Sequence, residues 1–300
     1  RGKIQLYVGN YDFWYESSKL ANELAANQNA KKEEKIKQLQ EFIARFSANA
    51  SKSRQATSRK KQLDKITLDD IKPSSRKYPF VKFEMHRDLG NDLVKVENVS
   101  YSVDGEKILD NVSFIVRPGD KVAFLSRNAL ATTALLDIVA GKIKPDSGTV
   151  TWGQSSAFYY MARDLNANFN NDDLTILDWL RQYATKEQDD NTFLRGFLGR
   201  MLFSGDEIEK KIKVLSGGEK VRCQLSRMML EPANVLIMDD PTNHLDLESI
   251  TALNDALVAY PGSILFTSHD HEFIQTIANH IIEVGPKGIV SRQDTTYDEF

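Results

Sequence analysis

The sequence predicts an α/β fold: a doubly wound parallel sheet with a helical insert, preceded by a helical linker. The runs VLIMDD at 235–240, SILFTSH at 263–269 and HIIEVG at 280–285 are short and apolar, as is typical of strands buried in a parallel sheet. Residues 174–203 carry apolar side chains at helical spacing, which indicates a helical subdomain. Residues 16–66 contain no Gly or Pro and are rich in helix formers.

Composition sets the broad class of protein. The chain has 300 residues with 41% hydrophobic content, enough for a sizeable core in one to three domains. Cys223 is the only cysteine, so no disulfide framework exists, which fits a reducing compartment. No apolar run approaches the roughly 18–20 residues of a membrane span, and no secretory leader is recognisable. We therefore expect a soluble, cytoplasmic protein.

The two ends of the chain resemble each other. RGKIQLYVGNYDFW at 1–14 aligns without gaps with KGIVSRQDTTYDEF at 287–300, an offset of 286 residues. An offset of that size favours a duplicated domain plus a linker over a solenoid repeat. We expect residues 1–15 to be the tail of a first domain copy, 16–90 a linker, and 91–300 a second copy. The helical subdomain is predicted at about 165–230.

Charge is concentrated in the linker. Residues 31–65 hold eleven basic and four acidic side chains, a net +7, which leaves −3 − 7 = −10 for the rest of the chain. Apolar residues at a coiled-coil-like spacing, followed by a second short helical pattern with Leu63 and Ile66, predict an antiparallel helical hairpin. The coiled-coil-like seam consists of Ile36, Leu39, Ile43 and Phe46.

The tip of this hairpin, residues 45–61, is basic and contains no acid. Lys and Arg among small polar residues suit contacts to a phosphate backbone. The alternative is a merely solvated linker, although such segments usually interleave both signs of charge. The basic side chains are Arg45, Lys52, Arg54, Arg59, Lys60 and Lys61.

The stretch LSGGEKVRC at 215–223 predicts a helix start with an anion site. Ser216 and Glu219 have the spacing of an S-x-x-E capping box. Gly217 and Gly218 leave the first backbone N–H groups uncovered, so an anion could approach the positive end of the helix. The alternative is a tight turn before an ordinary helix.

The stretch VLIMDDPTNHLD at 235–246 is an apolar strand that ends in two carboxylates. Such a strand end holds Mg²⁺ and activates water in α/β folds, so Asp239 is predicted to face a metal and Asp240 an attacking water. Asp246 projects from the following loop and is a further candidate nucleotide contact. His269, after the next strand, is predicted to sense a γ-phosphate, although a histidine at such a position is often structural.

These motifs together resemble the ATP-binding-cassette superfamily. The unbroken PTNHLD and the charged linker resemble its ABC-F family, and FSANASKSRQATSRKKQLDKI at 46–66 is similar to the linker of the YbiT-type branch. The resemblance implies a P-loop NTPase fold with antiparallel β and helical subdomains, and a tandem-cassette ATPase that uses ATP and Mg²⁺. It also implies a translation factor whose basic tip contacts ribosomal RNA or tRNA near the tRNA exit site. The implied RNA contacts are Lys52, Arg54, Arg59, Lys60 and Lys61.

The P-loop itself departs from this family's pattern. A P-loop needs G-x-x-x-x-G-K-[ST], and the corresponding residues 126–133 are SRNALATT. Only Thr133, the expected Mg²⁺ ligand, matches; Ser126, Asn128 and Thr132 are weaker candidate phosphate contacts. A missing charged hydrogen bond costs about 1.5–3 kcal/mol and a strained backbone position about 1–3 kcal/mol. ATP binding here is expected to be weakened a hundredfold or more.

Three further positions depart from the pattern. The adenine-stacking aromatic of the family falls near Val103, and Tyr101, on the same strand face, is the candidate substitute. Arg163 stands at the position of the Q-loop glutamine. Its positive charge could replace the P-loop lysine charge that is missing at Thr132, or it could pair with Asp239 and Asp240. Asp240 stands where the family has its catalytic glutamate, and its side chain is shorter. A small displacement of such a group can strongly lower the catalytic rate.

The resemblance thus implies an asymmetric protein. We expect this cassette to donate Ser216, Gly217, Gly218 and Glu219 to ATP held by a first cassette of the same chain, head-to-tail, while its own site is weak or inert. No membrane subunit is expected. Two alternatives stay open: the ATPase subunit of a membrane transporter, and a non-catalytic scaffold kept as a dimerisation surface.

Overall fold

A computed structural model describes seven segments of the chain, in two compact units. The units comprise residues 1–75 and 76–300, and each is described here by itself. The boundary between them lies earlier than the predicted end of the linker at residue 90. The described segments are 23–24, 27–41, 60–66, 77–85, 90–285, 288–293 and 297.

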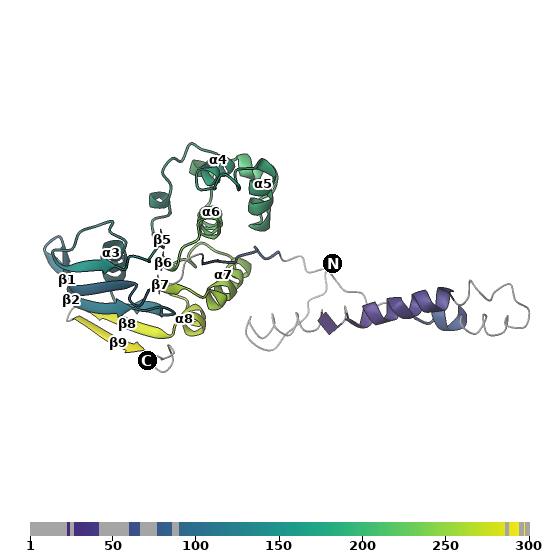
Figure 1. Cartoon of the computed structure of the whole chain (residues 1–300), viewed down its shortest axis with the longest axis horizontal. Coiled ribbons are helices and arrows are strands. Elements are labelled where there is room, and N and C mark those ends of the chain that lie inside the picture. Colours follow the sequence, from purple (N-terminus) through teal and green to yellow (C-terminus); the bar gives the residue numbers. More distant parts are fainter. Residues whose placement is uncertain are drawn as a thin grey trace, which may run out of the picture. The chain divides into compact units, whose positions relative to one another are not determined.

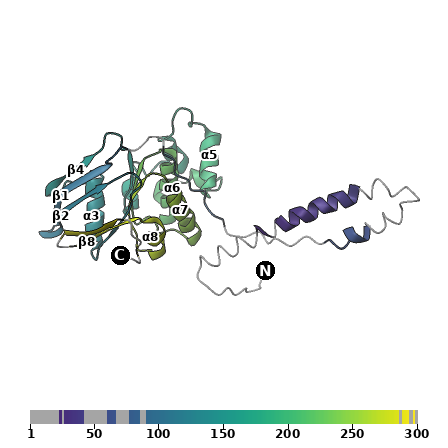
Figure 2. The same ribbon diagram turned by 60° about the horizontal axis from the view of Figure 1, so that its bottom comes forward.

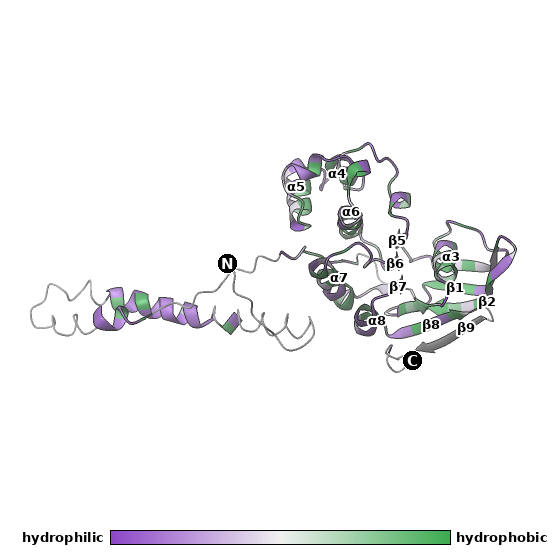
Figure 3. Ribbon diagram, turned by 180° about the vertical axis from the view of Figure 1, so that it is seen from behind, coloured by the Kyte–Doolittle hydropathy of each residue, from purple (hydrophilic) through white to green (hydrophobic). Residues whose placement is uncertain are grey.

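The described part of the first unit is helical at residues 27–41 and 60–63 (Figure 1). Figure 3 shows the longer helix as mostly hydrophilic with isolated hydrophobic bands. Leu39 is 6% exposed and Ile36 is half-buried, while the neighbouring charged side chains are largely exposed, as the predicted seam requires. Lys60 and Lys61 are exposed on the short helix. Other predicted features lie outside the described residues: segment 1–14, Ile43, Phe46, Arg45, Lys52, Arg54 and Arg59.

The second unit is built on a six-stranded sheet (Figure 1). The first five strands pair in parallel and the last pairs antiparallel with its neighbour. In spatial order the strands are β5 (Phe158–Met161), β6 (Val235–Asp239), β7 (Ser263–Thr267), β3 (Lys121–Leu125), β8 (His280–Gly285) and β9 (Gly288–Gln293). The strands predicted from the three apolar runs are therefore confirmed.

A smaller antiparallel sheet has the order β2-β1-β4. Its strands are β1 (Val94–Val103), β2 (Glu106–Val116) and β4 (Ser147–Trp152). The β1–β2 hairpin turns through Asp104 and Gly105, whose φ angles of 50° and 82° are those that a two-residue hairpin turn of the primed type requires. Helix α3 (Ala129–Val139) lies next to this sheet, as Figure 2 shows.

The strands β3, β6, β7 and β8 of the six-stranded sheet are buried on both faces, which explains their continuous apolar runs. Alternate side chains of a strand point to opposite faces. On β3, Val122 and Phe124 join the hydrophobic cluster that contains α3 and the antiparallel sheet, whereas Ala123 joins the cluster that contains the helices of the other face. Because α3 packs between the two sheets, its N-terminus is held close to the carboxyl ends of the parallel strands.

Helices cover the other face, and those between residues 165 and 230 form the predicted helical subdomain. Trp179 is fully buried at its centre, and Leu177, Leu180 and Phe197 are buried as their spacing predicted, while Phe193 is 38% exposed. The α-helices are α4 (Ile176–Arg181), α5 (Asn191–Arg200), α6 (Gly217–Leu230), α7 (Leu247–Ala259) and α8 (His271–Ile277), with 3-10 turns at Leu165–Asn168, Glu207–Glu209 and Ile212–Val214. Among the described residues, no helix is long and apolar enough to cross a membrane.

Residues 77–85 form an extended strap on this unit. The Phe80 N–H donates to the carbonyl of Arg200 at 2.9 Å, and the Arg200 guanidinium lies 5.6 Å from the centre of the Phe80 ring. Phe83 is 5% exposed and meets the ring of Tyr260 edge-on, with 6.2 Å between ring centres. The strap therefore joins the end of α5 to the residue that follows α7.

Candidate functional site

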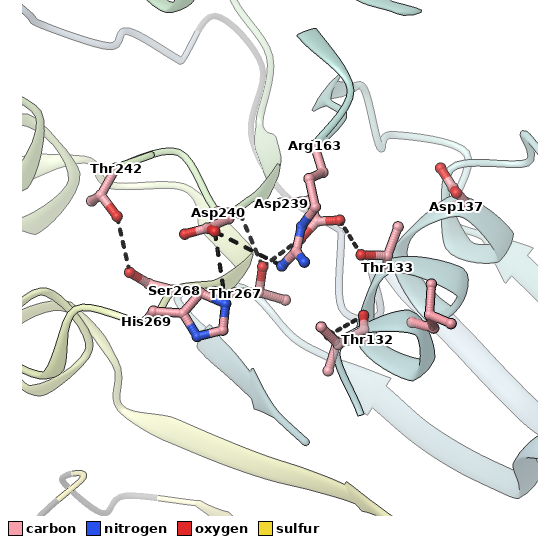
Figure 4. A network of polar contacts seen from close by, with 12 residues as sticks. Thr132, Thr133, Asp137, Arg163, Asp239, Asp240, Thr242, Thr267, Ser268 and His269 are labelled. Carbon is pink, nitrogen blue, oxygen red and sulfur yellow. Dashed lines mark hydrogen bonds and ion pairs between the residues drawn. The ribbon is translucent and has the colours of Figure 1, made fainter. Parts of the chain in front are cut away.

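A polar network lies at the carboxyl ends of the parallel strands (Figure 4). Asp239 ends β6, and Thr267 stands opposite it at the end of β7 in the parallel register. The next residues, Asp240 and Ser268, begin the loops that follow. Since parallel strands end at one edge of the sheet, this register gathers side chains 28 positions apart in the sequence into one site.

Asp239 is the centre of the network, and its side chain is fully buried. The Thr267 hydroxyl donates to Oδ1 at 2.6 Å, and the Thr133 hydroxyl donates to Oδ2 at 2.6 Å. A buried carboxylate requires such partners because leaving it unpaired would cost several kcal/mol. The structure thus brings together Thr133 and Asp239, the two predicted metal ligands, in a direct hydrogen bond.

Arg163 supplies a positive charge to the same carboxylates. Its Nη2 and Nε lie 3.2 and 3.3 Å from Asp239 Oδ1, and Nη2 lies 3.9 Å from Asp240 Oδ2. The loop that carries Arg163 follows β5 and is fixed by Asn168, whose side chain bonds both the N–H and the carbonyl of Ala162. Of the two roles suggested by the sequence, the structure shows the pairing with Asp239 and Asp240.

A third carboxylate stands near this network. Asp137, on α3, accepts a hydrogen bond from the Tyr160 hydroxyl at 2.7 Å (Figure 4 labels Asp137). Burial raises the pKa of Asp137 above its ordinary value; the Tyr160 hydrogen bond opposes this effect, and the negative charge of Asp239 adds to it. The edge of the sheet is therefore rich in negative charge.

Residues 126–133 form a turn that leads into α3, as predicted, but their polar groups are engaged locally. The Asn128 side chain caps the helix by accepting from the Leu130 N–H at 3.0 Å, and the Ser126 hydroxyl accepts from the Asn128 N–H at 3.1 Å. Thr132, at the position of the P-loop lysine, is 4% exposed and donates to the carbonyl of Ala129 at 3.1 Å. Thr132 therefore turns back to its own helix and presents no charge to the site.

The predicted catalytic residues meet at the end of β6 and β7. Asp240 has a φ of 56°, a left-handed conformation that aspartate tolerates better than most residues. Its N–H donates to the Thr267 hydroxyl at 2.9 Å. His269 follows β7, its side chain is 75% exposed, and its Nε2 lies 3.8 Å from Asp240 Oδ2. Asp239, Asp240 and His269 thus share one site, with His269 facing solvent.

A cleft of about 530 Å³ opens beside these groups. Ser126, Arg127, Thr132, Arg163 and His269 are among its lining residues. A neighbouring cavity of about 450 Å³ shares part of this lining and reaches the end of β8.

Tyr101, the candidate adenine contact, lines neither of these two cavities. It packs against the hydrophobic cluster between the antiparallel sheet and α3, as does Val103. A contact from Tyr101 to adenine stays a prediction.

The predicted capping box is present at the start of α6. The Ser216 hydroxyl accepts from the Glu219 N–H at 3.3 Å, and the Ser216 N–H donates to Glu219 Oε2 at 2.8 Å. Burial alone would raise the pKa of Glu219, but hydrogen bonds from Ser216 and from Lys210, whose Nζ lies 3.1 Å from Oε1, lower that pKa below its ordinary value.

Gly217 and Gly218 have a packing role in addition to the predicted anion site. A Cβ on Gly217 would lie 2.7 Å from Cγ of His244, and one on Gly218 would lie 2.8 Å from the His244 carbonyl oxygen. The two glycines therefore allow the loop after β6 to lie against the first turn of α6. Asp246, from the same loop, caps α7 by accepting from the Ser249 N–H at 2.8 Å; a contact from Asp246 to nucleotide stays a prediction.

Sequence reasoning missed Thr267 and Arg127. Thr267 bonds both Asp239 and Asp240, and Arg127 lines both cavities. Thr267 could have been found, because it ends an apolar run whose parallel neighbour ends in Asp239.

This combination of sheets, helical subdomain, LSGGE helix start and buried strand-end carboxylates defines an ATP-binding-cassette ATPase domain. Residues 109–243 match a family model described as ABC transporter, and residues 1–83 match a second model with the same description. Residues 109–243 are thus similar to the ATP-binding domains of ABC transporters, a family whose homologues imply ATPase activity.

Several curated relatives match almost the whole chain. It is 62% identical, over 99% of its length and 55% of the relative, to "Uncharacterized ABC transporter ATP-binding protein YkpA" of Bacillus subtilis (strain 168). It is 44% identical, over 96% of its length and 54% of the relative, to "Probable ATP-binding protein YbiT" of Escherichia coli O157:H7. It is 32% identical, over 94% of its length and 40% of the relative, to "ABC transporter F family member 5" of Arabidopsis thaliana. The chain spans about half the length of the first two of these relatives.

Solved structures support the fold. The ATP-binding cassette MJ0796, described as a dimeric post-hydrolysis state bound to ADP and Pi, matches with a TM-score of 0.56 and 17% identity, covering 68% of this chain and 100% of that one. The cbiO1 subunit from Clostridium perfringens matches with a TM-score of 0.53 and 18% identity, covering 68% of this chain and 89% of that one. At this level of identity the likeness concerns the fold alone.

Proposed function

We propose that this chain is part of a soluble, cytoplasmic ABC-F ATPase that binds the ribosome near the tRNA exit site and regulates translation through ATP binding and hydrolysis. The observation that carries the proposal is the basic segment 45–61, which contains no acid and belongs to a linker of net charge +7, in a chain whose remainder carries −10. Such one-sided charge suits ribosomal RNA or tRNA. The relative named as an F family member supports the same assignment.

The cassette is proposed to act asymmetrically with a first cassette of the same protein. Its α6 start, with the capping box at Ser216 and Glu219, is intact and would face ATP held by the partner cassette. Its own segment 126–133 lacks the P-loop glycines and lysine, and Thr132 is engaged by its own helix. We therefore expect weak or no nucleotide binding at this cassette's own site and catalysis at the other.

The residues at the sheet edge have the following proposed roles. Asp240 is the candidate base for the attacking water, and His269 is the candidate contact to a γ-phosphate, since its exposed ring lines the cleft. Domains of this family use ATP with Mg²⁺, and Asp239 with Thr133 would be the ligands closest to the metal in a competent site.

Ribosome binding tests the proposal. Replacing Lys52, Arg54, Arg59, Lys60 and Lys61 with Ala in the intact protein should lower ribosome affinity and make the remaining affinity less sensitive to salt, because fewer counterions are released on binding. A matched control removes the same charge from exposed cassette positions, and it should bind as the unchanged protein does. The control positions are Lys95, Lys107, Lys142, Lys186 and Arg195. Equal losses in the two variants would reject a specific role for the basic tip.

A non-catalytic scaffold is the second candidate function. The observation that favours it is the local engagement of Thr132 together with the Arg163 ion pairs, which leaves this site without the usual P-loop cation. ATP hydrolysis by the intact protein in the presence of ribosomes distinguishes the two. Ribosome-stimulated turnover supports the translation factor, whereas no turnover under any condition supports the scaffold.

A further inference from the structure

The carboxylate pair at the end of β6 provides a test of whether Mg²⁺ fits this site. Mg²⁺ requires near-octahedral oxygen ligands at about 2.0–2.1 Å. Oδ2 of Asp239 accepts the Thr133 hydroxyl, and Oδ1 accepts both the Thr267 hydroxyl and the Arg163 guanidinium. Three protein donors thus already surround the Asp239 carboxylate, and one of them, Arg163, is a cation that a metal would have to displace, so these residues fit a divalent cation poorly.

Charge leads to the same conclusion. The Asp239 and Asp240 side chains are 0% and 9% exposed, so their two negative charges need a compensating cation nearby. Arg163 contacts both carboxylates with its positively charged guanidinium. A divalent cation at this position would stand beside the guanidinium, and the two like charges would repel each other.

The position of Arg163 is built into the fold. Its loop follows β5, the parallel neighbour of β6, and the Asn168 side chain fixes that loop through Ala162. Only part of the guanidinium is solvent-accessible, since the Arg163 side chain is 31% exposed. A neutral glutamine at the same position would leave the two carboxylates without a counter-charge.

We propose that Arg163 is a built-in counterion that takes the place of the divalent cation, so that the Asp239–Asp240 pair of this cassette is closed to metal. The proposal deepens the proposed weakness of this cassette's own site: the closure is caused by one side chain as well as by the missing P-loop groups. Arg163 is a positioning residue in this proposal, because it acts only by pairing with the Asp239 and Asp240 carboxylates.

Divalent-cation binding to the isolated chain tests the proposal, with Mn²⁺ as the probe and electron paramagnetic resonance as the readout. The unchanged chain should show no saturable Mn²⁺ site in the micromolar range. Arg163→Gln should create a site at least tenfold tighter than any residual binding of the unchanged chain, and adding Asp239→Asn should abolish it. Arg163→Lys, which keeps the charge, should stay closed.

A matched control and a stability readout complete the design. Arg195→Gln removes an exposed guanidinium that pairs with Glu209 at 2.5 Å, and it should leave Mn²⁺ binding unchanged. The melting temperature of Arg163→Gln should rise in MgCl₂ relative to KCl of equal ionic strength, while that of the unchanged chain should not.

Two results would overturn the proposal. One is a saturable Mn²⁺ site in the unchanged chain that Asp239→Asn removes, a measurement that needs no Arg163 variant. The other is a folded Arg163→Gln chain that binds Mn²⁺ no better than the unchanged chain. Because neither measurement involves ribosomes, either failure leaves the ribosome proposal to be decided by the basic-tip experiment.

Discussion

Thr267 offers the sharpest test of how the buried carboxylate is held. Thr267→Val keeps the shape of the side chain at a site that is 4% exposed, and it removes the hydroxyl that donates to Asp239 Oδ1 at 2.6 Å. The Asp240 N–H would lose the same hydroxyl but would keep the Thr267 carbonyl at 3.2 Å, so little further cost is expected there. A hydrogen bond to a charged group contributes about 1.5–3 kcal/mol. We therefore expect a loss of about 2 kcal/mol in the free energy of unfolding.

Urea denaturation measures this loss as a lower midpoint with an unchanged slope. For a unit of this size, a loss of about 2 kcal/mol lowers the melting temperature by roughly 4–8 °C. Thr251→Val is the matched control, because its hydroxyl donates only to the Leu247 carbonyl on an exposed turn of α7. The control should stay within about 0.5 kcal/mol of the unchanged chain. If Thr267→Val also stays within this range, the Thr267 hydroxyl is not needed, and Thr133 and Arg163 suffice to hold Asp239.

The remaining predictions concern the start of α6. Gly217→Ala should destabilise the chain by about 1–2 kcal/mol, because the new Cβ would lie 2.7 Å from Cγ of His244. Gly196→Ala is the control: this glycine lies inside α5 with open space around it, so the change should stabilise the chain by about 0.5–1 kcal/mol. Equal stabilisation by both changes in urea denaturation would contradict the packing role of Gly217. Because hydrogen bonds and Lys210 hold the pKa of Glu219 below its ordinary 4.5, its charge stabilises the fold above that pH, and this contribution is lost as pH falls. Glu219→Gln should therefore be less stable than the unchanged chain at pH 7, and the difference should shrink as pH falls from about 4.5 through the lowered pKa of Glu219. A stability difference that stays constant from pH 7 to about pH 3 would refute this.

Local signals made much of the fold predictable. The strands at 235–240, 263–269 and 280–285 were visible because parallel strands buried on both faces are continuously apolar. The start of α6 was visible because a capping box links residues three apart, so Ser216 and Glu219 needed no tertiary information.

Features that depend on distant pairing were harder to predict. The pairing of Arg163 with both carboxylates was one of two alternatives, and only the placement of β5 beside β6 decides between them. The contact of Gly217 with His244 joins segments 27 positions apart through a loop conformation that no local pattern encodes. The surroundings of Tyr101 were not visible for a similar reason: the period of a strand gives the face on which a residue lies, but not which cluster lies against that face.

The strap at 77–85 limits the distance between two helices of the cassette. Phe80 is bonded to the end of α5 through Arg200, and Phe83, three residues later, is wedged against Tyr260 after α7. Three residues of fully extended chain span at most about 10 Å. While the contacts of Phe80 and Phe83 persist, this length limits the distance between the two points at which the strap is attached, at the end of α5 and after α7. The strap thus ties the end of α5 to the residue after α7 through a chain segment that lies outside both helices.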